Sequence, residues 1–423
     1  MKNGSRATLL LLAAFEISLS ACVSPKNSSL QPSSGASSSG TTFTDATSTH
    51  VPSAPRLHAL DAAMLDVDGD GDLDVAVAVE NGPNRLYINE GNGKLTEKAG
   101  IFAASSGDNE HVRAADFDGD GNVDLIFVAE DTEQHNLYLG DGKGGFRQAN
   151  KRLPARSQAN AVEVGDVNGD GTVDIVVGNT TEGRSGPAQT YLWLNDPARP
   201  GYFKDVTTTH MPQLDIQVQG IALVDVDGDG DLDILIAGQD PLNRLLLNDG
   251  TGHFSDATAD LGEQVPTETR EVHSLDANGD GLPDLIFFNL TSNNRAWDKD
   301  PQSRLLINLG NGKFKDETST RLPKHRFSSW GGTVVDFNGD GYPDLVVSAI
   351  DVPGFVPLQV RAWQNDGKGN FSDVTAAVIP EETRGRSWSM ARGDLDSDGK
   401  PDIFIGGWQS QARLLLSGRV ADK

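Results

Sequence analysis

The sequence contains a single cysteine, Cys22, among its 423 residues, so an internal disulfide framework is excluded. Basic residues are scarce as well: 35 Lys and Arg stand against 61 Asp and Glu, and no basic run occurs. The net charge of −26 therefore argues against a nucleic-acid partner. After the N-terminal segment, no apolar stretch is long enough to span a bilayer. The sequence also has no G-x-S-x-G, H-E-x-x-H or phosphate-loop pattern, which are common signatures of hydrolases, zinc proteases and nucleotide-binding enzymes.

What the sequence does contain is aspartate, concentrated in seven copies of one nine-residue pattern. Every copy has Asp at positions 1, 5 and 9, Asp or Asn at position 3, and Gly at position 6. The copies begin 50 to 60 residues apart, which indicates a repeat architecture. In chain order they are DVDGDGDLD (66–74), DFDGDGNVD (116–124), DVNGDGTVD (166–174), DVDGDGDLD (225–233), DANGDGLPD (276–284), DFNGDGYPD (336–344) and DLDSDGKPD (394–402).

The spacing of these side chains predicts a metal-binding turn. Carboxylate and amide oxygens at alternate positions can converge on one centre, and Gly at position 6 permits the required chain reversal. Ligation by oxygen alone favours Ca²⁺ over zinc or copper. An EF-hand is excluded because it requires Glu at position 12. That position holds an apolar residue in every copy: Val77, Phe127, Val177, Ile236, Phe287, Val347 and Ile405.

The segments around each copy predict four strands per repeat. Short β-branched runs precede and follow the Asp-rich turn, so that the turn joins two strands as a hairpin. A third strand ends near Asn and Gly, as in NRLLLNDG, and a fourth begins with Phe, as in FSDAT (254–258). Four-stranded units repeated radially form a β-propeller. The seventh repeat lacks its fourth strand, whereas FTDAT (43–47) precedes the first turn. We therefore predict an all-β, seven-bladed propeller whose N-terminal strand completes the last blade.

The combination of D-x-[DN]-x-D-G-x-x-D with N-x-L-x-x-N-x-G-x-G-x-F resembles the FG-GAP/VCBS-type repeats of integrin α-subunit propellers, some fungal seven-bladed lectins and many secreted bacterial proteins. The resemblance implies up to seven structural Ca²⁺ ions, held by positions 1, 3, 5 and 9 and by the carbonyl of position 7. The implied ligands are Asp66, Asp68, Asp70, Asp72 and Asp74; Asp116, Asp118, Asp120, Asn122 and Asp124; Asp166, Asn168, Asp170, Thr172 and Asp174; Asp225, Asp227, Asp229, Asp231 and Asp233; Asp276, Asn278, Asp280, Leu282 and Asp284; Asp336, Asn338, Asp340, Tyr342 and Asp344; and Asp394, Asp396, Asp398, Lys400 and Asp402. The turns with Asn at position 3 carry less charge, so we expect weaker binding there.

The N-terminus predicts export. Residues 1–21 have a basic start and an apolar stretch typical of a signal peptide, and Leu19-Ser20-Ala21-Cys22 resembles a bacterial lipobox. We therefore expect Cys22 to be lipidated and residues 22–40 to form a Ser-rich tether to the propeller at 41–419. Val23 after the cysteine favours the outer membrane. We expect a monomer.

Function is predicted at the end of the propeller away from the Asp-rich turns, because its connections are long and variable. Two Trp near several basic residues suit a glycan or an acidic ligand, although Trp rings also serve as packing between blades. The candidate ligand-binding residues are Arg270, His273, Trp330, Arg386 and Trp388. We expect a cell-surface binding module for a glycan or a protein. A polysaccharide lyase that uses Arg270 and His273, and a passive subunit of an envelope complex, remain as alternatives.

Overall fold

The computed structural model describes residues 41–103, 106–130, 134–154, 157–181, 188–239, 242–291, 299–352, 354 and 356–419. The predicted signal peptide and tether, including Cys22, lie outside these residues. No helix in the described ranges is long and apolar enough to cross a membrane.

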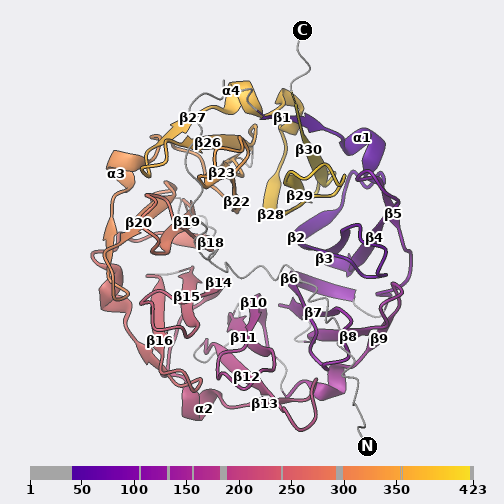
Figure 1. Cartoon of the computed structure of the whole chain (residues 1–423), viewed down its shortest axis with the longest axis vertical. Coiled ribbons are helices and arrows are strands. Elements are labelled where there is room, and N and C mark those ends of the chain that lie inside the picture. The colour runs from indigo at the N-terminus through magenta and orange to yellow at the C-terminus, as the bar shows by residue number, and fades with distance from the viewer. Residues whose placement is uncertain are drawn as a thin grey trace, which may run out of the picture.

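The described residues form four-stranded antiparallel units arranged around a central axis (Figure 1). In each unit the Asp-rich turn joins the first two strands, and the first strand lies nearest the axis. Unit 1 contains β2 (His58–Leu65), β3 (Asp74–Pro83), β4 (Arg85–Asn89) and β5 (Leu95–Glu97); unit 2 contains β6 (Ser106–Ala115), β7 (Asp124–Ala129), β8 (Asn136–Gly140) and β9 (Phe146–Gln148); unit 3 contains β10 (Ala159–Gly165), β11 (Asp174–Asn179), β12 (Tyr191–Asn195) and β13 (Phe203–Asp205); and unit 4 contains β14 (Val218–Val224), β15 (Asp233–Gly238), β16 (Arg244–Asn248) and β17 (Phe254–Asp256).

The remaining units follow the same order, and the predicted strands of every repeat are present. Unit 5 contains β18 (Glu268–Leu275), β19 (Asp284–Leu290), β20 (Arg304–Asn308) and β21 (Phe314–Asp316); unit 6 contains β22 (Gly332–Val335), β23 (Asp344–Val347), β26 (Arg361–Asn365) and β27 (Phe371–Asp373); and unit 7 contains β28 (Ser387–Gly393), β29 (Asp402–Trp408), β30 (Arg413–Arg419) and β1 (Thr41–Asp45). Short pairings also link β2 to β29 and β3 to β6. Outside the units, β24 (Ile350–Asp351) pairs with β25 (Val356–Pro357).

Short helical turns follow most fourth strands: α1 (Thr47–His50), η1 (Asn150–Arg152), α2 (Thr207–His210), η2 (Thr258–Leu261), α3 (Thr318–Arg321) and α4 (Thr375–Val378), with η3 (Glu381–Thr383) after α4. The F-x-D-x-T motif precedes α1, α2, η2, α3 and α4 and explains how they start, whereas η1 follows FRQAN. In unit 3, Asp205 Oδ1 accepts a hydrogen bond from Thr207 N at 2.9 Å, which turns the chain. The Thr207 hydroxyl oxygen then accepts one from Leu192 N at 3.0 Å and ties the helical turn to the third strand.

The same motif acts across the two ends of the chain. β1 pairs antiparallel with β30, from Thr41 opposite Arg419 to Asp45 opposite Leu415, and the two lie side by side in Figure 1. Thr47 Oγ1 accepts a hydrogen bond from Leu414 N at 3.0 Å, as its counterpart does within unit 3. β1 therefore lies beside β30, in the position that the fourth strand has beside the third strand in the other units.

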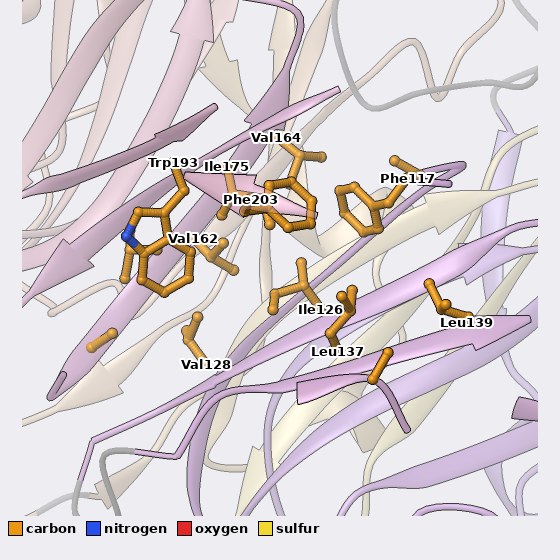
Figure 2. Close-up of a cluster of buried hydrophobic side chains, with 14 residues drawn as sticks. Phe117, Ile126, Val128, Leu137, Leu139, Val162, Val164, Ile175, Trp193 and Phe203 are labelled. Carbon is orange, nitrogen blue, oxygen red and sulfur yellow. The ribbon is translucent and has the colours of Figure 1, made fainter. Parts of the chain in front are cut away.

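The core lies between neighbouring units rather than inside one sheet. Figure 2 shows the cluster between units 2 and 3, where Ile126, Leu137 and Phe117 face Val162, Trp193 and their neighbours. The second strands supply continuous buried runs such as DLIFVA and DIVVGN. Because both faces of each sheet are covered, every unit needs a neighbour on each side.

Candidate metal centres

Each Asp-rich turn is folded by its own backbone amides. In the first copy, Asp66 Oδ1 accepts a hydrogen bond from Gly69 N at 2.7 Å, and Asp66 Oδ2 accepts one from Gly71 N at 3.1 Å. Asp70 Oδ1 accepts one from Asp72 N at 2.9 Å. Gly71 has φ +95°, a left-handed conformation that glycine adopts without strain. These bonds bend the chain so that the carboxylates of positions 1, 3 and 5 face one another.

The Asp at position 9 braces the unit. Asp74 is 1% exposed; its two oxygens accept hydrogen bonds from Val67 N at 3.0 Å and from Asn89 N at 2.8 Å. It thus joins the turn to the third strand. Burial raises the pKa of the Asp74 carboxyl to about 7. The other six copies have the same paired bonds and pKa values of about 6 to 7, raised chiefly by burial: Asp124, Asp174, Asp233, Asp284, Asp344 and Asp402.

The turns with Asp at position 3 have carboxylate oxygens that fit a hard cation. Asp68 Oδ1 and Asp118 Oδ1 are buried and accept no hydrogen bond within the described part of the chain. Burial, followed by repulsion from Asp70 and Asp66, raises the pKa of Asp68. Four groups place one carboxylate oxygen per residue within 4.8 Å of the others: Asp66, Asp68 and Asp70; Asp116, Asp118 and Asp124; Asp225, Asp227 and Asp229; and Asp394, Asp396 and Asp402. Convergent anionic oxygens of this kind suit Ca²⁺.

The turns with Asn at position 3 contain a hydrogen bond that the Asp side chain cannot donate in the other turns, from the Asn amide to the aspartate at position 5. Asn278 Nδ2 donates a hydrogen bond to Asp280 Oδ2 at 2.9 Å. Asn168 and Asn338 bond their own position-5 aspartates in the same way, at 3.0 and 2.9 Å. The amide group therefore occupies a carboxylate lone pair that an ion would otherwise use. The side chains present in these three turns still supply oxygen ligands, but with one fewer charge.

The Asn that ends most third strands has a role that sequence reasoning missed. Asn248 Nδ2 donates to Leu232 O in its own turn at 3.0 Å and to Val167 O in the turn of unit 3 at 2.7 Å. Asn89 makes the corresponding bond to Leu395 O at 2.7 Å, which links unit 1 to unit 7. The recurring Asn was a visible signal, but its partner lies in another repeat. Equivalent bonds are donated by Asn195, Asn308 and Asn365.

Three of the predicted ligand-binding residues are brought together, but they are buried. Trp330 and Trp388 stack with ring centroids 3.7 Å apart and are 4% and 8% exposed. The Arg270 guanidinium lies 4.7 Å from the Trp330 ring, and Arg270 donates to Gln219 Oε1. These side chains pack against one another close to the axis and leave little surface for a ligand.

The other two predicted residues, Arg386 and His273, are more accessible, and their contacts are with residues outside the group of Arg270, Trp330 and Trp388. Arg386 lies over the Trp408 ring at 5.4 Å, and His58 contacts that ring with centroids 5.4 Å apart. Trp408, which the sequence analysis did not select, ends β29 at the opposite end from the Asp-rich turn. His273 instead bonds Glu271, with 3.2 Å between Nε2 and Oε2.

A charged network that was not predicted joins the first strands of four units, β2, β6, β10 and β28. Arg113 Nη1 donates to Asp61 Oδ2 at 2.8 Å, and Arg113 Nε donates to Glu163 Oε2 at 2.9 Å. Ser389 Oγ donates to Asp61 Oδ1 at 3.0 Å. Burial opposes ionisation of Asp61, but Arg113 and then His111 lower its pKa below the usual value. The network therefore fixes neighbouring units around the axis.

Comparison with known families finds FG-GAP-like repeats at residues 66–127, 124–177, 225–287, 276–347 and 355–405. Cartilage acidic protein 1 of Xenopus tropicalis is 26% identical over 90% of this chain, and its Homo sapiens counterpart is 24% identical over 84%. This chain spans 63% and 57% of the length of these two relatives, respectively.

Among solved structures, BBS1N in complex with ARL6DN aligns over 90% of this chain and 99% of its own, with a TM-score of 0.55 and 12% identity. At that identity, the likeness concerns the fold. An Agrocybe aegerita lectin that recognises non-reducing terminal N-acetylglucosamine aligns over 86% of both chains with a TM-score of 0.49 and 20% identity.

Proposed function

Because the chain belongs to the FG-GAP-like repeat family, we propose that it is a closed seven-bladed β-propeller that binds Ca²⁺ in its Asp-rich turns and a glycan or protein ligand at the opposite end. The units of the fold are the blades. The observation that carries the metal assignment is that Asp68 Oδ1 and Asp118 Oδ1 are buried and, among the described residues, accept no hydrogen bond. A buried anionic oxygen without a partner costs free energy, which a cation would offset.

Closure of the ring is supported by contacts between units 1 and 7. Besides the β1–β30 pairing, Trp408 Nε1 donates to Glu80 Oε2 at 2.5 Å. Phe43 in β1 is 1% exposed and contacts Phe337 of unit 6 edge-on at 6.4 Å. Unit 7, with β1 as its outer strand, therefore contacts unit 1 through Trp408 and unit 6 through Phe43, which supports a closed ring.

The matched test of closure compares Phe43→Ala with Phe203→Ala, the equivalent position in unit 3. If β1 is an integral fourth strand, each substitution lowers the free energy of unfolding by about 3–5 kcal/mol. Denaturant unfolding measures both. A loss at Phe203 with almost none at Phe43 would contradict closure.

In the metal assignment, positions 1, 3, 5 and 9 and the position-7 carbonyl hold the ion. Bound Ca²⁺ neutralises the carboxylates and fixes the hairpin between the first two strands. The backbone amides bonded to Asp66 already orient its carboxylate. Binding of the ion therefore costs less conformational entropy at this side chain. The role of the metal is therefore structural.

Ligand binding is proposed at the end where β29 stops and β28 begins. Arg386, Trp408 and His58 form a partly exposed cationic and aromatic platform there. Aromatic faces stack on sugar rings, and guanidinium groups pair with acidic groups. The buried Trp330 and Trp388 support this platform from beneath, since Trp388 and Trp408 have centroids 6.3 Å apart.

The test is a glycan-panel screen of calcium-loaded protein that lacks residues 1–22, with polymer length followed in parallel. Binding that Arg386→Ala weakens at least tenfold and that Arg199→Ala preserves supports a binding module. Arg199 is the control because its side chain is 70% exposed and belongs to the turn between β12 and β13. Cleavage would support the lyase alternative, and no binding would move the search to protein partners.

Anchoring is proposed from the lipobox-like Leu19-Ser20-Ala21-Cys22 sequence. The protein is exported and attached by Cys22 to the outer membrane, with the Ser-rich segment as its tether. Mass spectrometry of the membrane-associated protein tests this. Diacylated Cys22, and release of the protein by Cys22→Ser, are the expected results; an unmodified thiol would contradict them.

A further inference from the structure

A basic side chain lies against the Asp-rich turn of unit 2. Arg152 ends η1, the helical turn that follows the fourth strand of this unit. Its Nη1 donates a hydrogen bond to Asp118 Oδ2 at 3.3 Å, and both side chains are largely shielded from solvent. Asp118 is the position-3 residue of the turn, so a cation of the protein itself lies beside an implied metal ligand.

Unit 3 holds the Arg152 guanidinium in place. The guanidinium lies over the Tyr202 ring, 4.6 Å from its centroid. Gly201, with φ +82°, permits this close approach, because a Cβ there would lie 2.6 Å from Arg152 Nη1 and 2.8 Å from Asp118 Cβ. The stacking restrains the guanidinium, so the ion pair with Asp118 costs less side-chain entropy than an ion pair between free side chains.

The Asp-rich turn of unit 4 has Asp at the same position but no such cation. The helical turn of that unit, η2, ends at the buried Leu261 and has no basic residue in its last turn. Burial, followed by repulsion from Asp229, raises the pKa of Asp227, the position-3 residue. Within the described part of the chain, no Lys or Arg forms an ion pair with Asp227. The two turns therefore differ in whether the protein supplies a positive charge at position 3.

Given the proposed binding of Ca²⁺ in the turns, on which this inference rests, we propose that Arg152 is a tethered cation that competes with Ca²⁺ at the Asp-rich turn of unit 2. When the turn is empty, the guanidinium offsets part of the Asp118 charge. When the turn is filled, it repels the ion beside it. Asp118 Oδ1, which accepts no hydrogen bond from the described residues, is still available as a ligand. The turn therefore binds Ca²⁺ with reduced affinity and depends on it less.

The first test measures calcium occupancy turn by turn. Crystals of wild type and of Arg152→Gln are prepared at the same limiting Ca²⁺ concentration, and the anomalous peak at the unit 2 turn is compared with that at the Asp227 turn. The substitution should raise this ratio, equivalent to a roughly threefold lower Kd at the unit 2 turn, because water and salt screen the repulsion. Arg199→Gln is the matched control. Arg199 also lies over the Tyr202 ring, at 5.4 Å, but it pairs with Asp196, which belongs to no Asp-rich turn.

The outcomes separate the proposal from the calcium assignment. An unchanged or lower ratio in Arg152→Gln, with the turns occupied, would overturn the proposal alone. An equal rise in Arg199→Gln would also overturn it, because the effect would then come from the Tyr202 ring and not from the charge beside Asp118. Absence of peaks from every turn in all three proteins would overturn the calcium assignment and the proposal with it.

The second test compares stability with and without the metal. Arg152→Gln should lower Tm in chelator and lower it less in saturating Ca²⁺, because the guanidinium stabilises the empty turn and opposes the filled one. Arg152→Lys keeps the charge and should restore most of the loss in chelator. Equal losses in chelator and in Ca²⁺, or a Lys variant that behaves like the Gln variant, would show a packing role only and would overturn the proposal.

Discussion

The turns with Asp at position 3 and those with Asn at position 3 share one backbone but differ in how they satisfy their oxygens. In the first group, Asp68 and Asp118 each keep one buried oxygen that accepts no hydrogen bond from any residue that the structure describes. In the second, Asn278 and its counterparts donate to the carboxylate two residues later. Replacing an oxygen by an NH₂ group therefore lets the turn bond internally. The comparison teaches that copies of one repeat can depend on metal to different degrees.

Chelation of Ca²⁺ should have the largest effect. A site whose ligand is present at 100 times Kd contributes about 2.7 kcal/mol. If each of the four turns with Asp at position 3 is occupied at that level, removing the four ions should lower Tm by roughly 10–15 °C for a domain of this size. Calorimetry with and without chelator measures the change, and re-addition of Ca²⁺ is the control. An unchanged Tm would contradict the metal assignment for both groups of turns.

Substitution at position 9 should affect both groups equally. Asp233→Ala and Asp284→Ala each leave two buried backbone N–H groups without acceptors. The expected loss in chelator is about 2–6 kcal/mol in either case. In Ca²⁺ the loss is larger, because each substitution also removes a metal ligand. Denaturant unfolding in chelator is the measurement. If the free energy of unfolding fell only in Ca²⁺, position 9 would stabilise the fold by binding the ion and not by accepting the two backbone hydrogen bonds.

The pH dependence of the metal-free protein follows from the same carboxyl groups. Their pKa in the folded protein is about 6 to 7, as for Asp74 and Asp402, against an ordinary value of 3.8. A raised folded pKa stabilises the protein at low pH, and this contribution is lost as pH rises through the folded value. His111 and His135, whose pKa burial lowers to about 4, act in the opposite direction but are outnumbered.

In chelator, Tm should therefore fall between pH 4 and pH 7. In saturating Ca²⁺ the fall should be smaller, because the ion favours the ionised carboxylates. Melting at pH 5 and pH 7 under both conditions checks the sign. Higher Tm at pH 7 than at pH 5 in chelator would contradict the assigned pKa directions.

Exchange at position 3 should have the smallest effect and compares the two groups directly. Asn278→Asp removes the internal bond and adds a charge, so it should tighten calcium binding at that turn by roughly tenfold. Asp227→Asn should weaken binding at its turn by a similar factor. Titration against a competing chelator measures both, and each variant is the control for the other. Shifts in the same direction would refute the explanation.

The strands and turns within each repeat could be predicted from the sequence, whereas the contacts between residues of different repeats could not. The spacing of the turns and the F-x-D-x-T motif predicted the strands, and FTDAT at residues 43–47 predicted the partner of β30, because each signal is local. The bond from Asn89 to Leu395 joins residues 306 positions apart and has no local signature. Trp330 and Trp388 were expected to contact a ligand, but their stacking depends on the approach of two different units. That approach also decides how deeply Arg270 is buried.

The most direct test is diffraction from crystals prepared at limiting Ca²⁺, using the anomalous scattering of calcium. We expect peaks in the Asp-rich turns, with the turns containing Asp68, Asp118, Asp227 and Asp396 filled before those containing Asn168, Asn278 and Asn338. Absence of any peak in the turns would contradict the assignment of calcium, and earlier filling of the Asn-containing turns would contradict the distinction between the two groups.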